Sequence, residues 1–202
     1  VASPRGSFLT KGVVYGATIG LATFLCAVPS WAQDDEAAGR VLYNEGLALM
    51  SGGDFAQACP KLEESLRLKY NLNVHYFFAD CLEKQGRTAS AWAAFLSVES
   101  KAKALAETSK ARQARARADA LEPRLARLTI RSAEWPQGFE LRRAGVVVGK
   151  GLMGTALPVD PGEIEIVATA PGHVAYRASV HVEPGAGVKG EIPVLALESP
   201  TA

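Results

Sequence analysis

The glycines and the lysine of residues 145–154, GVVVGKGLMG, form the pattern in this chain best suited to binding a phosphate group. Residues 149–154 match G-x-G-x-x-G, the loop of dinucleotide-binding folds, in which the start of a following helix holds the pyrophosphate. Pro158 and Pro161 come too soon after this loop for a helix to begin there. The match therefore does not predict nucleotide binding.

A phosphate-binding P-loop is excluded on spacing. Only three residues separate Gly145 from Gly149 and Lys150, and Gly151 stands where a Ser or Thr would bind magnesium. We expect turn geometry instead, with Gly145 closing a hairpin and with positive φ at Gly149, Gly151 and Gly154.

The other reactive side chains form no catalytic or metal-binding pattern. His75, His173 and His181 fall in separate predicted elements, and the sequence contains no G-x-S-x-G, H-E-x-x-H or EF-hand motif. His181 and Glu183 share one strand face, which is too few ligands for a metal. We expect no catalytic residue, no metal and no cofactor, and thus a protein that is not an enzyme. A formal net charge of +1 gives no reason to expect nucleic acid as a partner.

Residues 1–32 are typical of a secretory signal peptide. Arg5 and Lys11 precede an apolar run over residues 12–28, and small residues end the segment, which predicts cleavage after Ala32. The alternative is an uncleaved anchor, and contact with a membrane is expected only in that case. The sequence predicts a periplasmic or secreted protein.

Export affects the interpretation of the cysteines. Cys26 lies in the signal, which leaves Cys59 and Cys81 as a pair in an oxidising compartment. We predict a disulfide between them; two buried free thiols are the alternative.

Residues 33–124 are predicted to form a helical domain of about five helices, because apolar residues recur there at helical spacing. The first helix is expected from about Ala38 to Met50. Asp54, with Gln57 three residues on, predicts a capped second helix, a third begins near Asn73, and Thr88 is expected to cap a fourth.

The two helix pairs resemble each other at an offset of 33 residues, since Gly53 corresponds to Gly86. In each pair a small residue follows that Gly after five positions and a large apolar one comes four later, as in Gly53, Ala58 and Leu62. A helix-turn-helix unit with a period near 34 resembles the tetratricopeptide repeat.

This resemblance implies a concave surface on the first and third helices that binds a protein segment. Its polar and aromatic candidates are Tyr43, Glu45, Asn73 and Tyr76.

A fifth helix over residues 109–122 is expected to cover the repeats, with an apolar face of alanines and leucines. Its other face holds Lys110, Arg112, Arg115 and Arg117. We interpret this face as solvated and ion-paired; the alternative is a dock for acidic glycans or lipid headgroups.

Residues 125–198 are predicted to form a small antiparallel β-sandwich, because short alternating segments are separated by turn residues such as Pro136 to Gly138 and Asp160 to Gly162. The ordered turns, with Gly145 and the sequence APGH at 170–173, resemble the PEGA domain of bacterial envelope proteins. The resemblance implies an extracytoplasmic structural or binding module without catalytic residues.

The fold class is thus α+β in two domains. The sequence predicts an exported, non-enzymatic adaptor that binds a segment of an envelope protein. The alternative is a protein that binds cell-wall glycan or peptidoglycan through Trp135, Arg142, Arg143 and Tyr176.

Overall fold

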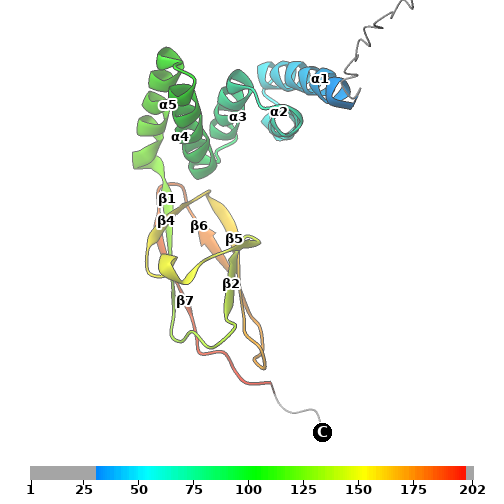
Figure 1. Ribbon diagram of the computed structural model, residues 1–202. Coiled ribbons are helices and arrows are strands. Elements are labelled where there is room, and N and C mark those ends of the chain that lie inside the picture. Colours follow the sequence, from blue (N-terminus) through cyan, green and yellow to red (C-terminus); the bar gives the residue numbers. More distant parts are fainter. Residues whose placement is uncertain (1–30, 199–202) are drawn as a thin grey trace, which may run out of the picture.

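The computed structural model describes residues 31–198, with side chains from residue 34 onward (Figure 1). The predicted signal peptide lies outside the described residues except for Trp31 and Ala32, which open the first helix. Within residues 31–198 no helix has both the length and the apolar character needed to cross a membrane.

Five helices come first and a sheet-rich part follows, so the α+β fold class is confirmed. In Figure 1 the helices lie in a row from α1 to α5, and each packs mainly against its neighbours in sequence. They are α1 (Trp31–Ser51), α2 (Phe55–Leu68), α3 (Leu72–Lys84), α4 (Thr88–Ala104) and α5 (Thr108–Leu121).

Asp54 caps the start of α2 as predicted, but the Gln57 side chain binds the Asp54 carboxylate and not its backbone N–H, so the capping box is incomplete. Asp54 Oδ1 accepts a hydrogen bond from the backbone N–H of Gln57 at 3.1 Å, and its Oδ2 accepts one from the Gln57 side chain at 2.6 Å. Asn71 caps α3 in the same way, with its side-chain oxygen accepting from the N–H of Asn73 at 2.9 Å. Both helices therefore begin where a polar side chain satisfies their free N–H groups.

Small residues let the helices approach closely. A Cβ atom added at Gly46 of α1 would lie 2.9 Å from Cγ of Leu62, which is fully buried in α2. Ala58 and Ala91 are fully buried, as is Phe95 of α4. The predicted alternation of small and large residues at the helix contacts is confirmed.

Cys59 of α2 and Cys81 of α3 form a disulfide, with their Cα atoms 5.7 Å apart. Both residues are buried in a cluster that includes Ala58, Leu62 and Val74. The predicted pairing is confirmed, and the bond ties together the two helices that link one helix pair to the next.

We expect the bond to stabilise the fold by about 3 kcal/mol, because it closes a loop over a sequence separation of 22 residues in the unfolded chain. Denaturant unfolding with and without reductant measures this difference. Mass analysis after alkylation under denaturing, non-reducing conditions should detect no modified thiol at Cys59 or Cys81. Two alkylated cysteines would contradict the pairing.

A short 3₁₀ turn (Glu122–Arg124) leads from α5 into seven strands arranged in two sheets. One sheet has the order β4-β1-β7 and the other β3-β2-β5-β6. The strands are β1 (Ala126–Ser132), β2 (Glu140–Arg143), β3 (Val146–Val147), β4 (Ala156–Val159), β5 (Gly162–Thr169), β6 (Tyr176–Val182) and β7 (Gly187–Ile192). The core lies between the sheets and includes Leu128, Leu141, Ile166 and Val182.

One strand pair departs from the expected antiparallel pattern. β7 runs parallel to β1, with Leu128 opposite Val188. After β6 the chain crosses from the second sheet to the first. Because β7 does not form a hairpin with β1, the two strands can run parallel.

The G-x-G-x-x-G segment leads into a strand, as its prolines predict. A three-residue 3₁₀ turn (Lys150–Leu152) follows Gly149, and then comes β4, which lies at a sheet edge and so tolerates Pro158. Gly154 has a φ of +74°, but Gly149 has a φ of −69° and Gly151 is not in the positive region, so the prediction is wrong for these two. The short turn needs only ordinary negative φ values.

Asp160, directly after β4, connects the sheet domain to the helical domain. Its Oδ1 accepts from the backbone N–H of Ser90 in the first turn of α4 at 2.8 Å, and its Oδ2 accepts from the Ser90 hydroxyl at 2.5 Å. Arg87 Nε adds a contact of 3.2 Å to the same carboxylate. A carboxylate at a helix N-terminus satisfies free N–H groups and is favoured by the helix dipole.

This contact corrects the prediction that Thr88 caps α4. Thr88 is the first helical residue, its side chain is buried, and its hydroxyl has no hydrogen-bond partner in the described part of the chain. The side chain of Arg87, the N-cap residue of α4, makes no capping hydrogen bond either. The cap comes instead from Asp160, which lies 70 residues from Ser90 in the sequence.

We expect Asp160→Ala to destabilise the protein by about 1–2 kcal/mol through loss of this cap. It should also change the orientation of the two domains, because the same carboxylate joins them. Residual dipolar couplings measured on each domain report that orientation. Asp54→Ala is the matched control, since it removes a cap within the helical domain and should lower stability without reorienting the domains. Unchanged couplings in Asp160→Ala would show that this contact does not set the orientation.

Candidate functional site

The helical domain contains a groove of about 420 Å³ between α1 and α3, with the end of α2 as its floor. We call it the α1–α3 groove. Its walls carry polar and aromatic side chains from three segments: Glu36, Gly39, Arg40, Tyr43 and Asn44 of α1, Ser65 and Lys69 at the end of α2, and Tyr70, Asn71, Asn73 and Val74 at the start of α3.

The α1 residues of the groove recur at steps of three and one from Glu36 to Asn44, which places them on one helix face. At the floor, the Ser65 hydroxyl donates to the carbonyl of Gly39 at 2.7 Å, so the Ser65 side chain links α2 to the backbone of α1. Lys69 forms an ion pair with Glu36 and ties the end of α2 to α1. The groove thus has a fixed floor, and it is open above.

Two tyrosines give the groove aromatic walls. Tyr43 is half-buried, with its ring 6.0 Å from that of Phe77, while Tyr70 is 46% exposed and stands edge-on to His75. Burial raises the pKa of both hydroxyls, so both tyrosines are neutral at physiological pH. They present flat apolar faces with a polar tip, the combination that is enriched at protein interfaces.

His75 contacts the Tyr70 side chain. Its Nδ1 lies 3.3 Å from the Tyr70 hydroxyl, and burial, together with the nearby charge of Lys101, lowers its pKa. The neutral ring can accept a hydrogen bond from the Tyr70 hydroxyl at Nδ1, whereas the protonated ring cannot.

The structure brings together two of the four predicted partner-binding residues. Tyr43 and Asn73 face each other across the α1–α3 groove. Glu45 lies elsewhere, in an ion pair with Lys61 of α2 at 2.6 Å. Tyr76 packs against Phe95 at a centroid distance of 5.4 Å and is not among the groove-lining residues.

Arg40, Asn44 and Tyr70 line the groove but were not singled out from the sequence. A signal for the first two is present, since Arg40 and Asn44 share the face of Tyr43 along α1. Tyr70 lies between α2 and α3, where helical periodicity does not predict the direction of a side chain. Its position depends on how α2 and α3 meet.

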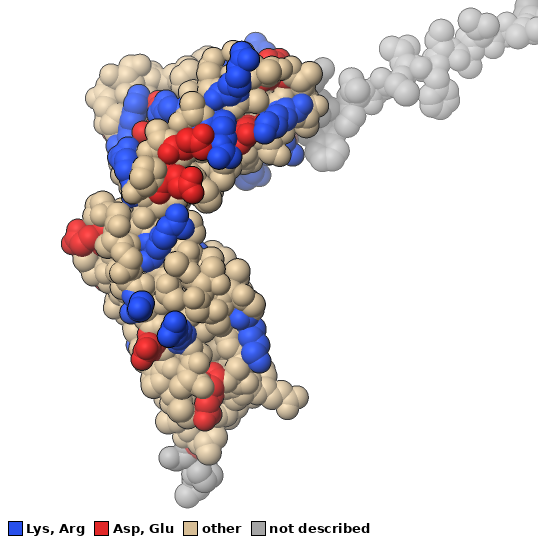
Figure 2. Space-filling view, turned by 90° about the vertical axis from the view of Figure 1, so that its left-hand side faces the viewer, with Lys and Arg blue, Asp and Glu red and all other residues tan. Residues whose placement is uncertain are grey.

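Two of the four basic residues of α5, Arg115 and Arg117, form ion pairs, while the Lys110 ammonium lies 4.9 Å from the centroid of the Tyr76 ring. Arg117 reaches Asp80 and Glu83 of α3 at 2.6 Å each, and Arg115 reaches Asp119 at 2.7 Å. Figure 2 shows acidic and basic side chains side by side on this face of the helical domain. The apolar face of α5 is buried as predicted, at Ala111, Ala114, Ala118 and Leu121.

The predicted glycan-binding residues of the sheet domain are spread over different surfaces. Trp135 is half-buried, and its ring centroid lies 4.4 Å from that of Phe139. The Lys150 ammonium lies 5.8 Å from the centroid of the Trp135 ring. Tyr176 is half-buried and packs against the same core, and it pairs across the sheet with Ala168. Both rings therefore present only part of their surface to solvent.

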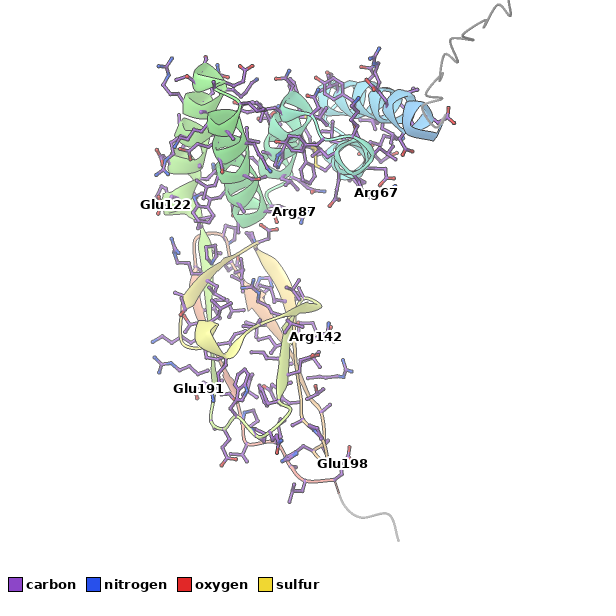
Figure 3. All side chains as sticks on the ribbon, viewed as in Figure 1. Arg67, Arg87, Glu122, Arg142, Glu191 and Glu198 are labelled. Atoms are coloured by element: carbon purple, nitrogen blue, oxygen red, sulfur yellow. A yellow bond between two sulfur atoms is a disulfide. The ribbon has the colours of Figure 1, made fainter. Side chains whose placement is uncertain are left out.

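Arg142 and Arg143 are adjacent on β2, so their side chains point to opposite faces of the sheet. Arg142 is exposed on the outer side (Figure 3) and donates to Glu140 at 2.7 Å and to the carbonyl of Gly145 at 3.0 Å. Arg143 is half-buried at the end of the sheet that meets α4. The four residues thus do not converge on one surface.

His181 is held between two carboxylates on the exposed face of β5 and β6. Its Nδ1 lies 2.8 Å from Glu163 and its Nε2 lies 2.9 Å from Glu183. The hydrogen bond with Glu183 contributes most, and that with Glu163 next, to raising the pKa of His181. In the described range 31–198 there is no group of three or more His, Cys, Asp or Glu side chains arranged to hold a metal ion.

Comparison of the chain with protein-family models, with curated proteins and with solved structures finds no match in any of the three. The candidate site is therefore defined by the geometry of the α1–α3 groove.

The two shifted histidines give opposite pH effects. We expect the imidazole of His75 to titrate below the ordinary value of about 6.5 and that of His181 above it, which NMR titration of the ring protons measures directly. Because the unfolded chain protonates His75 before the folded one does, this residue lowers stability as the pH falls below about 6.5. His181 has the opposite effect: its stabilisation develops as the pH falls through its raised folded pKa, above about 6.5, and is present at lower pH.

In unfolding experiments, His75→Gln should reduce the loss of stability on going from pH 7 to pH 5, and His181→Gln should increase it. The same change in both variants would contradict this assignment.

Proposed function

We propose that this protein is an exported, non-enzymatic adaptor that binds a segment of another cell-envelope protein in the α1–α3 groove. It would act in the periplasm or outside the cell. The helical domain would carry the binding site, and the sheet domain would position it. The resemblances of the sequence to tetratricopeptide repeats and to the PEGA domain agree with this proposal.

The observation that carries the proposal is the combination of side chains in the groove. Asn44 and Asn73 lie on opposite walls, and the side-chain amide of an asparagine both donates and accepts, as a peptide backbone requires. Tyr43 and Tyr70 add flat surfaces on which apolar side chains of a partner can pack. A volume of about 420 Å³ lies within the range of small binding sites and suits a few residues of an extended segment.

Site-specific photo-crosslinking tests the groove. A photoreactive amino acid that replaces Asn73, inside the groove, should become crosslinked to an envelope protein. The same photoreactive amino acid in place of Ala56, which is exposed on α2 outside the groove, should give no such crosslink. Tyr70→Ala should reduce the crosslink at Asn73 several-fold, because it removes one wall. Identical products from both positions, or none from Asn73, would count against the groove as the binding site.

The alternative function is binding of cell-wall glycan, with Trp135 as the stacking surface. Its support is the partial exposure of that ring beside the cation of Lys150. Retention of the protein on purified sacculi, lost in Trp135→Ala but kept in Tyr70→Ala, would favour this alternative. Retention unaffected by Trp135→Ala would reject Trp135 as the glycan contact.

A further inference from the structure

A second groove, of about 650 Å³, lies where the helical domain meets the sheet domain. We call it the junction groove. It is built by the first turns of α4 and by the end of β2, β3, β4, the start of β5 and the 3₁₀ turn at Lys150–Leu152. Figure 1 shows the lower end of α4 against the upper end of the sheets, and Figure 3 places Arg87 at this junction. The junction groove shares no residue with the α1–α3 groove.

The walls of the junction groove are largely apolar. Trp92 of α4 faces Leu157 and Pro158 of β4, and Val146 and Leu152 form the rim. Val146 is 66% exposed and Leu152 is 45% exposed, so both present apolar surface to water in the absence of a ligand. Junctions between domains and apolar walls with a few polar groups are common features of small-molecule sites.

Three of the four charged side chains in the junction groove are already engaged. Arg87 pairs with Asp160 at 3.2 Å, and Asp160 also caps α4. Glu163 accepts from the Ser179 hydroxyl at 2.5 Å and contacts His181 at 2.8 Å.

Arg143 is the exception. Its Nη1 is shielded from solvent and has no hydrogen-bond partner, and no carboxylate lies within 4.0 Å of its guanidinium among the residues that the structure describes. Burial of the charge without a partner costs free energy and lowers the pKa of Arg143. An anion bound at Arg143 would remove that cost.

We propose that the junction groove binds a small monocarboxylate with an apolar chain, such as a medium-chain fatty acid. The carboxylate pairs with the part of the Arg143 guanidinium that lines the groove, away from the shielded Nη1, and the chain lies along Trp92, Val146 and Leu152. A single negative charge fits better than a phosphate dianion, because Asp160 and Glu163 line the same groove and repel a dianion more strongly than a monoanion. The apolar rim is then covered by the chain.

Calorimetric titration of the full chain with octanoate and with octan-1-ol tests this site, because the two probes share the chain and differ in the charge. We expect saturable binding of octanoate and binding of the alcohol that is weaker by about tenfold or more. Arg143→Gln should reduce octanoate affinity to the level of the alcohol. Arg142→Gln is the matched control, since the neighbouring guanidinium points to the other face and already has partners.

A second variant keeps the test independent of any folding defect in Arg143→Gln. Leu152→Glu places a like charge on the exposed rim, and it should weaken octanoate at least about tenfold while changing octan-1-ol binding little. The proposal is overturned by an absence of saturable octanoate binding, by equal affinity for acid and alcohol, or by equal losses in Arg142→Gln and Arg143→Gln.

Discussion

Asp160 joins the two domains through a single carboxylate. It accepts from the backbone and side chain of Ser90 and pairs with Arg87, so the end of β4 is fixed to the first turn of α4. Because the carboxylate is half-buried at a helix N-terminus, charge, dipole and hydrogen bonding act in the same direction. We therefore expect the orientation of the sheet domain, and hence the shape of the junction groove, to depend on this contact.

Within the helical domain, the corresponding constraint is the close approach of α1, α2 and α3. Gly46 leaves room for Leu62, Ser65 reaches the backbone of Gly39, and the disulfide between Cys59 and Cys81 fixes α2 to α3. These contacts hold the three segments that line the α1–α3 groove. Its polar side chains thus stand on a rigid base, which limits the ordering cost of binding a partner.

The two grooves suit different ligands because their side chains differ in chemistry. The α1–α3 groove offers amides and neutral tyrosines, which match the mixed donors and acceptors of a peptide. The junction groove offers apolar walls and one guanidinium without a partner, which match a small amphiphilic anion. The formal net charge of +1 gives no strong overall field, so neither ligand is expected to be attracted over a long range.

The sequence by itself determined the elements whose signals are local: the helix cap at Asp54, the buried faces of the helices, the strands that alternate, and the exclusion of a helix after Gly154. It also predicted the disulfide, because the predicted signal peptide contains Cys26 and leaves Cys59 and Cys81 as a pair. The tertiary structure decided what depends on distant partners. Asp160, not Thr88, caps α4. Tyr43 and Asn73 line one groove while Glu45 and Tyr76 lie elsewhere, and Arg143 has no carboxylate partner among the described residues. Helix periodicity and turn residues act over a few positions, whereas these outcomes depend on contacts between residues tens of positions apart, which no local pattern encodes.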